Sequence, residues 1–561
     1  MASSEPQAYY EPVMGEEDED EGKLITYGFP EEPSVFDYAL HPYRSFNCFM
    51  ATLVHNFGMK FAIQIGVMYL CVKGSLNSVM GLIKLSYCKK TLNIDGNACQ
   101  TMMSVAMTPW AIKGALGVMA DAYPLFGYHK KWYIILSSIM GTCAFTFLAA
   151  VPLHQAAMAA SLMFLCNLQI ATCDLLCEGK YAELMQRKPK TGSTMVSYVW
   201  GLFQLGSFFA SVFVGPIADA YDPRIIFWGC IPLAASIIIP TYLNYLSDEE
   251  VPEEKRGFDW ELVKEHPYII AFCLIMAAVA LGNAILDLVA FDSHLYQMLY
   301  AVGTTVGLSI LAFRWLPRQL AMCNFYMFIS CVLYINISGA QDFWFTADEK
   351  CVPGGPGFDY TYYNTYASLV GSVTGWLGIV LFQWLMSDWN FRTLFWMTTL
   401  IQIVASGFDM IMIARLNIEW GISDKAFYMF GDAVIGNVVG MFGLMPMLVL
   451  TSKLVPKGLE ATTYALLAGF QNFGGVVSSQ IGIYATQFAG VKTKDPCDFT
   501  NLNLLVFICH CALPLIAIPL TFLLIPDKKM TDKIIDEDGG DVQSREEDEG
   551  ALAHPSGSKR K

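Results

Sequence analysis

Charged residues are scarce in this chain. Lysine, arginine, aspartate and glutamate make up 15% of its 561 residues, against roughly 25% in soluble domains. Hydrophobic residues make up 54%, and apolar runs recur from Phe49 to Ile525, each near the roughly 20 residues that cross a hydrocarbon core. This composition excludes an ordinary soluble protein and predicts an all-α polytopic membrane protein.

The sequence also lacks the motifs of several enzyme classes. It contains no GxxxxGK[ST] phosphate-binding loop, which argues against an ATP-driven pump, and no HExxH pair of a metalloprotease. The eight histidines are scattered and no metal-ligand spacing occurs. We therefore expect no enzymatic activity, no catalytic residue, no metal and no cofactor. Because no basic region precedes an apolar stretch at the N-terminus, we also expect no cleavable signal peptide.

The net charge of -15 is concentrated in two tails and one loop. Acidic residues outnumber basic ones by 11 to 2 in residues 1–47, by 8 to 3 in residues 248–265 and by 10 to 7 in residues 527–561. Residues 1–47 and 527–561 have too little apolar surface to offset the entropy of ordering, so both tails are predicted to be disordered. An acidic chain repels nucleic acid, which leaves a small molecule and membrane lipid as the expected partners.

The apolar segments fall into groups of six, two and six. We expect a six-helix bundle in residues 48–243, an acidic cytoplasmic loop at 244–265, an inserted helix pair at 266–318 and a second bundle at 319–526. The fourteen expected spans are residues 49–72, 98–119, 132–151, 157–177, 194–214, 224–243, 268–289, 294–313, 320–340, 364–386, 392–414, 427–450, 461–487 and 501–525. Two bundles facing each other across a cavity are typical of secondary transporters, although the halves show no clean sequence repeat.

Basic residues in the short loops favour one side of the membrane, which predicts that both termini are cytoplasmic. Most of the sixteen cysteines lie inside apolar segments, where a free thiol behaves as a small hydrophobe. Four cysteines fall in loops that this orientation places outside, where disulfides are chemically permitted. These are Cys88, Cys99, Cys351 and Cys497.

The stretch PWAIKGALGVMADAYPLFGYHKKWY, residues 109–133, places a lysine inside an apolar segment. Lys113, Gly117 and Asp121 lie at intervals of four and share one face of the predicted helix. A lysine near membrane depth costs at least a few kcal/mol unless it meets water, a partner or a ligand. Lys113 is therefore a candidate substrate-binding residue, and a structural ion pair or snorkelling to the interface is the alternative.

The loop after this segment holds a second group of charges. Asp121, Gly127, Lys130 and Lys131 are expected to form a tight turn with a carboxylate near basic residues at the cytoplasmic mouth. We interpret this group as a conformational latch and not as a substrate site.

Two carboxylates, Asp174 and Glu178, lie four apart on one face of the predicted fourth helix. Paired acids in an apolar setting favour the binding of a proton, so both residues are candidates for proton coupling, and Asp174 is also a candidate for substrate binding. The alternative is that Asp174 pairs with Lys113, and Glu178 with a cytoplasmic cation such as Lys180, without titrating.

Gln471 and Asn472 lie deep in a segment of the second half. Their side chains can both donate and accept hydrogen bonds, as recognition of a heterocyclic amide edge requires. Hydrogen bonding between helices is the alternative.

Residues 109–133 are similar to the signature of the folate/biopterin transporter family of the major facilitator superfamily. The shared features are a Pro-Trp, an Ile-Lys, a Gly, an Asp, and Pro-Leu-Phe-Gly-Tyr before a basic pair, in this order. The segments ATCDLLCEGKYAE, NFRTLFW and GLEATTYALLAGFQNFGG resemble further family stretches, and residues 341–363 resemble the kinetoplastid branch. Gly114 and His129 depart from the pattern, because many relatives carry proline and arginine there.

The resemblance implies a major facilitator-type fold and secondary transport of folate or biopterin by alternating access, with proton symport and without a cofactor. It also implies a protein that functions as a monomer, and the plasma membrane is the expected location for a nutrient importer. Relatives that carry S-adenosylmethionine make that cation the alternative substrate. A non-transporting membrane sensor is the alternative of a different class.

Overall fold

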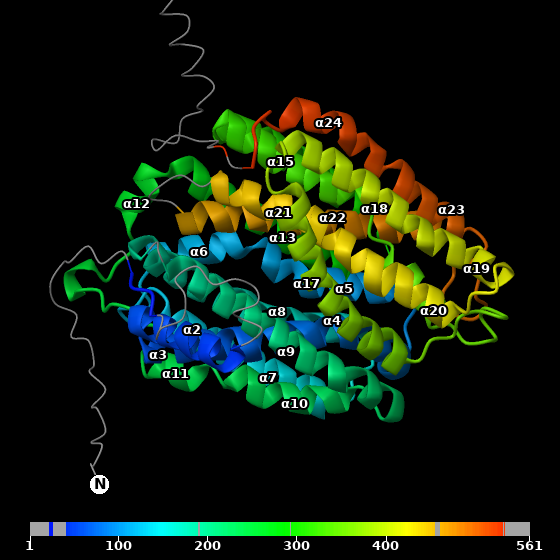
Figure 1. Ribbon diagram of the computed structural model, residues 1–561, viewed down its shortest axis with the longest axis horizontal. Helices are drawn as coiled ribbons and strands as arrows, with labels where there is room; N and C mark the ends of the chain where they lie inside the picture. Colours follow the sequence, from blue (N-terminus) through cyan, green and yellow to red (C-terminus); the bar gives the residue numbers. More distant parts are fainter. Residues whose placement is uncertain are drawn as a thin grey trace, which may run out of the picture.

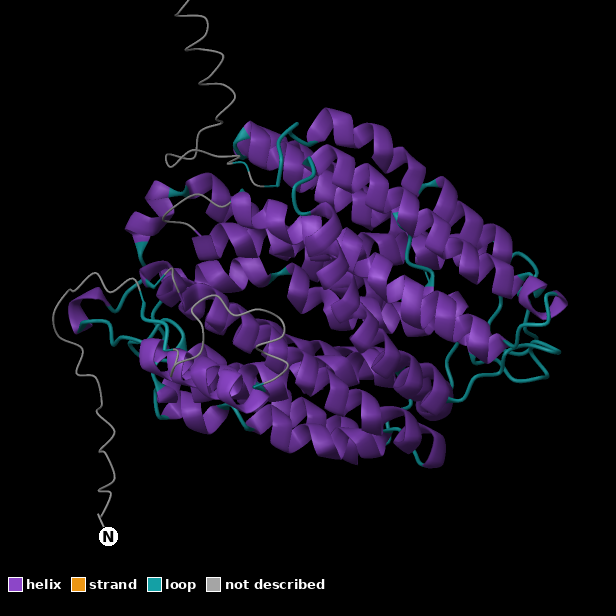
Figure 2. Cartoon of the chain, viewed as in Figure 1, coloured by secondary structure: helices purple, strands orange, loops and turns teal. Residues whose placement is uncertain are grey.

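A computed structural model describes residues 22–25, 41–188, 191–291, 293–454, 460–530 and 532. Across these ranges the secondary structure is helical, with isolated bridges in place of named strands. Figure 2 shows the helices packed side by side along one common direction. The prediction of an all-α fold is confirmed.

The helices form two bundles (Figure 1), and a helix pair connects them in the chain. The first bundle contains α2 (Pro42–Phe57), α3 (Met59–Val67), η1 (Met68–Leu76), α4 (Asn77–Ser86), η2 (Tyr87–Leu92), α5 (Gly96–Ala111), α6 (Lys113–Ala122), α7 (Lys131–Ala150), α8 (Ala156–Arg187), α9 (Gly192–Ala220), α10 (Arg224–Ala235) and α11 (Ile238–Tyr242). We call this bundle the N-half. Segments η1 and η2 are π-helical and continue the axis of α3 and α4.

The second bundle is the C-half. It contains α15 (Arg318–Leu333), α16 (Ser338–Phe345), η5 (Thr361–Tyr366), α17 (Ala367–Met386), α18 (Phe391–Ile413), α19 (Leu416–Glu419), α20 (Asp424–Tyr428), η6 (Met429–Gly436), α21 (Asn437–Lys453), α22 (Glu460–Phe488), α23 (Leu502–Val506), η7 (Phe507–Ala512), η8 (Pro514–Ile516) and α24 (Ala517–Leu524). Between the halves lie η4 (Glu253–Lys255), α12 (Trp260–Glu265), α13 (Pro267–Val289) and α14 (His294–Trp315).

Eleven helices in the described part of the chain are long and apolar enough to cross a membrane, or up to twelve if the bent pair α15 and α16 forms one span. Every predicted span overlaps a helix, but the count of fourteen is not confirmed. One reason is that α5 and α6 separate at Ile112, so neither is long enough alone. Another is α22, whose glutamine, asparagine and serine residues lower its hydropathy.

The first span differs from the predicted residues 49–72. Helix α2 ends at Phe57, Gly58 adopts a left-handed φ of 82°, and the chain then continues as one 34-residue helix over Met59–Leu92. Lys73 therefore lies inside the span and does not end it. As a consequence, Cys88 is in the last turn of this helix and not in a loop.

The boundary of the N-terminal tail at residue 47 falls inside a helix, because α2 begins at Pro42. A short upstream segment also contacts this helix: the amide of Lys23 donates to Asn56 at 3.0 Å and that of Ile25 donates to Thr52 at 3.0 Å. The remainder of the predicted N-terminal tail, and the predicted C-terminal tail beyond residue 532, lie outside the described residues.

Helix α13 of the inserted pair packs against both halves, whereas α14 packs against α13 and the C-half, and the pair shares the core of the C-half. Met276 of α13 and Leu308 of α14 are buried in one apolar cluster with Phe470 of α22. A second cluster fills the N-half and extends to Ala284 of α13 and to Phe343 and Tyr360 of the C-half. Apolar packing as well as polar contacts therefore joins the two halves.

The two ends of the molecule differ in their loops. We call the end that carries Cys88, Cys99, Cys351 and Cys497 the cysteine end, and the opposite end, which holds Pro42 and Leu524, the tail end. In Figure 1 the cysteine end is on the right, with α19 and α20, and the tail end is on the left, with α6 and α12.

Candidate functional site

The position of Lys113 follows from a break in the helix that carries it. Pro109 has no N–H to donate to the preceding turn, and α5 ends two residues later at Ala111. Ile112 leaves the helical conformation, with φ of -93° and ψ of 8°, and Lys113 begins α6. Gly114 then permits close packing, because a Cβ there would lie 3.0 Å from the Cys273 sulfur of α13.

Lys113 lies in a buried cluster of ionised groups in the N-half. Its Nζ atom is 2.6 Å from Oδ2 of Asp174 on α8 and 3.9 Å from Oε2 of Glu178, one turn further along the same helix. Lys113 and Asp174 are 6% and 1% exposed. The structure thus brings together three of the predicted site residues, from two helices that are distant in sequence.

A second lysine, Lys73, completes this cluster. Its Nζ atom is 2.8 Å from Oδ1 of Asp174, whose same oxygen accepts a hydrogen bond from the Tyr69 hydroxyl at 3.2 Å. Lys73 and Tyr69 both belong to the π-helical segment η1, and such segments are frequent at functional sites. The sequence analysis missed Lys73 because it placed the end of the first span there, although the apolar pattern continues to Leu85.

Aromatic rings cover the two lysines. The Nζ atom of Lys113 lies 4.9 Å from the centre of the Trp110 ring, and that of Lys73 lies 5.8 Å from the Trp200 ring. Trp110 is itself held by Asn167, which accepts from its indole N–H at 3.2 Å. These rings contribute cation–π attraction to each ammonium group and provide flat surfaces beside them.

Of the two amide candidates on α22, only Asn472 reaches this region. Its side-chain amide donates to the Trp110 carbonyl at 3.2 Å, across the interface of the halves. Gln471 points to a different place, since its amide contacts the Met327 sulfur at 2.9 Å and the Thr451 hydroxyl at 3.4 Å inside the C-half. The structure therefore separates two residues that the sequence analysis had grouped.

The charges of the cluster balance when all four groups are ionised. Asp174 is held between two lysines, whereas Glu178 has only the longer contact to Lys113 and a hydrogen bond from Tyr181 at 3.3 Å. The side chains also differ in exposure. Those of Lys73 and Glu178 are 17% and 23% exposed, whereas those of Lys113 and Asp174 are 7% and 1% exposed. The cluster thus has a closed, paired inner part and a more accessible outer part.

A cavity of about 380 Å³ lies in the C-half, within the size range of small-molecule sites. Aromatic and hydroxyl side chains from several helices face it, together with glycines of α21 that leave space. The residues that carry these features are Tyr326, Ser330, Tyr334, Phe395, Thr398, Thr399, Gln402, Gly440 and Gly443. The Tyr334 hydroxyl is hydrogen-bonded to Ser406 at 3.0 Å.

The predicted latch residues lie at the tail end, away from the ion cluster. Asp121 is on α6, Gly127 has a left-handed φ of 82°, and Lys130 and Lys131 precede and begin α7. The backbone amides of both lysines donate to one carboxylate oxygen of Asp248, at 2.9 and 3.0 Å. A carboxylate is favoured at a helix N-terminus, so this contact fixes the acidic loop against the start of α7.

The remainder of the acidic loop also binds this turn. The amide of Val251 donates to the Gly127 carbonyl at 2.8 Å, and Arg256 pairs with Glu250 at 2.6 Å. His129, which departs from the family pattern, contacts the Ala120 carbonyl through Nδ1 at 2.8 Å. The 244–265 segment, predicted only as an acidic cytoplasmic loop, is therefore packed on the turn between α6 and α7.

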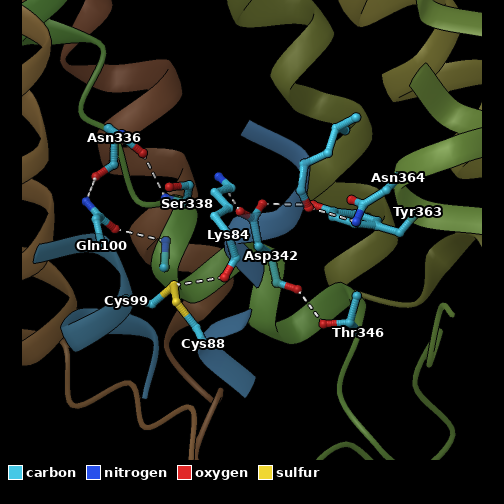
Figure 3. Close-up of polar contacts among 12 residues, drawn as sticks. Lys84, Cys88, Cys99, Gln100, Asn336, Ser338, Asp342, Thr346, Tyr363 and Asn364 are labelled. Carbon is cyan, nitrogen blue, oxygen red and sulfur yellow. Dashed lines mark hydrogen bonds and ion pairs between the residues drawn. A yellow bond between two sulfur atoms is a disulfide. The ribbon is translucent and has the colours of Figure 1, made fainter. Parts of the chain in front are cut away.

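At the cysteine end, polar contacts join the two halves. We call them the seam. In Figure 3, Lys84 of α4 points at Asp342 of α16, and the two charged groups are 2.8 Å apart. Asp342 also accepts from the Tyr363 hydroxyl at 2.8 Å. Asn364, which follows Tyr363 in the chain, donates to the Leu82 carbonyl of the N-half at 2.9 Å.

Further seam contacts come from Gln100 on α5. Its amide nitrogen donates to the Asn336 carbonyl at 2.6 Å (Figure 3) and to the Ser479 carbonyl at 3.1 Å, and its oxygen accepts from the Gly339 amide at 2.9 Å. Asp219, at the end of α9, accepts from the Tyr360 amide and from the amide and hydroxyl of Thr361. The seam therefore joins the two halves through three helices of the N-half, α4, α5 and α9.

The four cysteines predicted to lie in loops are paired in the structure, although Cys88 and Cys99 lie within helices. Cys88 bonds to Cys99, with Cα atoms 5.8 Å apart, and Cys351 bonds to Cys497, with Cα atoms 5.2 Å apart. The first pair joins the end of the first span to the start of α5 and lies beside Gln100 (Figure 3). The second joins two loops of the C-half that are 146 positions apart.

Two helical bundles, a helix pair between them and ionised side chains inside one bundle define a polytopic membrane transporter with the major facilitator-type fold. The crystal structure of the POT family transporter PepTSo matches this chain with a TM-score of 0.57 and 13% identity, covering 83% of this chain and 97% of that one. The nucleoside transporter NupG matches with a TM-score of 0.54 and 13% identity, covering 83% of this chain and 100% of that one. At these identities the likeness shows the fold alone.

The chain belongs to the BT1 family, whose model matches residues 73–546. Curated relatives include the folate-biopterin transporter of Synechocystis sp., which is 26% identical over 481 residues and covers 83% of each chain. The probable folate-biopterin transporter 2 of Arabidopsis thaliana is 26% identical over 465 residues, or 82% of each chain. Folate transporter 1 of Plasmodium falciparum is 22% identical and covers 86% of this chain and 80% of its own length.

The expectation that the chain is not an enzyme is confirmed by its family, because these relatives are transporters. The chain is an integral membrane transporter that acts on a small molecule. The kinetoplastid assignment of residues 341–363 stays a prediction.

Proposed function

We propose that this chain carries a pteridine of the folate and biopterin type across a membrane by alternating access, in symport with protons. The observation that carries this proposal is the Lys73, Lys113, Asp174 and Glu178 cluster, which keeps two ammonium groups and two carboxylates inside the N-half. The names of the relatives supply the substrate class.

The cluster fits an anionic passenger that enters with a proton. When all four groups are ionised the charges cancel, but a proton on Glu178 leaves one lysine charge without a counterion. A carboxylate such as that of folate would then be drawn to the accessible ammonium of Lys73. Proton and substrate would therefore favour each other's binding, which is the requirement for symport.

Asp174 has a different part in this proposal. Its two oxygens are taken up by Lys113, Lys73 and Tyr69, so it holds the lysines in place and stays ionised. This agrees with the pairing alternative for Asp174 and leaves Glu178 as the proton carrier. Asn472 and the rings of Trp110 and Trp200 would contact the pteridine, while Gln471 would support the C-half.

Alternating access is supported by the division of the chain into two bundles and by the seam, whose hydrogen bonds and ion pair join the halves at one end. We place both termini in the cytoplasm and the cysteine end outside, in the plasma membrane, with the monomer as the working unit. Asp121, Gly127, Lys130 and Lys131 would then act with the acidic loop as the latch on the cytoplasmic side.

A competition assay tests this proposal. Cells expressing the chain would take up labelled folate at two external pH values, with unlabelled folate, biopterin or S-adenosylmethionine as competitors. We expect pteridines to compete and uptake to be faster at the acidic pH. Inhibition by S-adenosylmethionine alone would favour the cationic substrate, although two lysines oppose a sulfonium. Binding without uptake would favour a sensor.

A further inference from the structure

The inserted helix pair carries a buried acid that the ion cluster does not use. Asp287 lies near the end of α13 and is 0% exposed. Its Oδ2 atom accepts from the side-chain amides of Asn283, at 3.2 Å, and Gln480 of α22, at 2.6 Å. The Gln480 amide is also 3.1 Å from the Ser104 hydroxyl of α5. The network thus connects the inserted pair, the N-half and the C-half.

Three side-chain oxygens of this network lack a hydrogen-bond partner within the described part of the chain. Among the described residues, no donor reaches Oδ1 of Asp287, and the side-chain oxygens of Asn283 and Gln480 also lack a partner. All three residues are 0% exposed. A buried acceptor without a donor costs about 1 to 3 kcal/mol, so one additional hydrogen at Oδ1 of Asp287 would remove part of this deficit.

Asp287 also lacks a counterion among the described residues, in contrast to Asp174. The side chains that interact with it from its own helix, from α22 and from α5 are the neutral Asn283, Gln480 and Ser104. The adjacent helix α14 carries four titratable groups, His294, Tyr296, Tyr300 and Arg314. Nδ1 of His294 contacts Gln297 at 3.1 Å, and the Tyr300 hydroxyl donates to the Val279 carbonyl of α13 at 3.2 Å. An ionised carboxylate buried without a cation is costly, and such groups take up a proton instead.

We propose that Asp287 is a proton-binding site of the inserted helix pair, and that its proton keeps the seam closed. The link to the seam is direct in the chain: Ser104 is one turn after Gln100 on α5, and Gln480 follows Ser479 on α22. Gln100 and Ser479 are hydrogen-bonded to each other in the seam.

Opening the seam would separate these same two helices at Gln100 and Ser479 and admit water to Asp287. In water the carboxylate is stable and releases its proton. By linkage, binding of the proton favours the closed seam, and its loss favours the open one. This role differs from that of Glu178, whose proton accompanies the substrate, and it rests on no assumption about which substrate is carried.

The test is a distance measurement on substrate-free protein in lipid nanodiscs. Spin labels at Tyr221→Cys, at the end of α9, and Ile422→Cys, before α20, report the separation of the halves at the cysteine end. Both positions are exposed, and Cys143→Ser removes an exposed native thiol. Pulsed electron paramagnetic resonance then follows the distance from about pH 5 to about pH 9, where buried carboxyls release protons.

We expect the parent protein to change from a short to a long distance as the pH rises, with the long-distance fraction growing several-fold. Asp287→Asn keeps the hydrogen-bonding shape but cannot ionise, so its distance should stay short throughout. Gln480→Leu removes a donor that stabilises the carboxylate, so its transition should move to higher pH. Asp388→Asn, an exposed acid beyond α17, should behave as the parent does.

The proposal is overturned if the parent distance does not change with pH, or if Asp287→Asn changes as the parent does. If Asp287→Asn does not fold, an unshifted transition in Gln480→Leu overturns it. The distance measurement needs no substrate, so a result that overturns the role of Asp287 would not contradict the proposed pteridine transport. Conversely, a failure to observe pteridine transport would not change the measured distances.

Discussion

Lys113 and Asp174 are 61 positions apart in the chain, and their charged atoms lie 2.6 Å apart inside the N-half. The first begins α6 after a proline-linked break and the second lies within the long helix α8. Lys73 forms an ion pair with the other oxygen of the Asp174 carboxylate. This shared carboxylate fixes two ammonium groups at one place, which is the arrangement that an anionic substrate needs.

Lys113→Ala should abolish uptake or reduce it by at least tenfold. The substitution leaves Asp174 with Lys73 alone and removes one of the two charges that would attract a carboxylate. Breaking a buried ion pair costs about 3 to 5 kcal/mol, so the amount of protein at the cell surface must be measured by biotinylation. Lys180→Ala, which affects a pair with Glu183 near the tail end, is the control. Normal uptake by Lys113→Ala would remove the site assignment.

Glu178→Gln should flatten the dependence of uptake on external pH, because the amide cannot take up the proton that accompanies the substrate. Initial rates of folate uptake at several pH values measure this. Asp174→Asn provides the comparison: it should lower activity at every pH, since it leaves two lysines without their shared anion. If Asp174→Asn instead flattened the profile while Glu178→Gln kept the parent dependence, the two assignments would have to be exchanged.

Lys84→Asp should weaken the closed cysteine end, because it opposes a like charge to Asp342 across the seam. Uptake should fall several-fold, and combining it with Asp342→Lys should restore part of the activity by reversing the pair. The pair is partly exposed, at 31% and 18%, so its coupling free energy should be near 1 kcal/mol or less. Rates for both single variants and the double variant test this. Strict additivity would argue against a seam contact that matters for transport.

The loop disulfides should contribute unequally to stability. The bond between Cys351 and Cys497 closes a much longer loop than that between Cys88 and Cys99, with separations of 146 and 11 positions. Closing a longer loop removes more entropy from the unfolded chain, within a range of about 2 to 5 kcal/mol. Paired serine substitutions should therefore lower the melting temperature more at Cys351 and Cys497. Equal melting temperatures for the two double variants would contradict this.

Sequence alone could identify three members of the ion cluster, because a charge inside an apolar run is visible without a structure. Helical spacing placed Asp174 and Glu178 on one face, and the cost of a buried lysine marked Lys113. Lys73 escaped because the first span was predicted to end one residue before it, at residue 72. The break at Ile112 was likewise not predicted, although Pro109 indicated a local weakness in that helix.

The contacts between distant segments could not be predicted from local pattern. Asp219 and Tyr360 are 141 positions apart, and nothing in either neighbourhood indicates the other. The contact of Asp248, in the acidic loop, with the backbone amides at the start of α7 could not be predicted for the same reason. Asp287 is likewise visible in the sequence only as an acid in the inserted pair. Their partners became apparent only when the packing of the halves was known.

The most direct test of the central claim is uptake by purified protein reconstituted in liposomes with an inward proton gradient. We predict saturable accumulation of labelled folate, inhibition by unlabelled pteridines, loss of accumulation when the gradient is dissipated, and loss of uptake with Lys113→Ala. Folate binding without accumulation, or uptake that is unchanged in Lys113→Ala, would contradict the account.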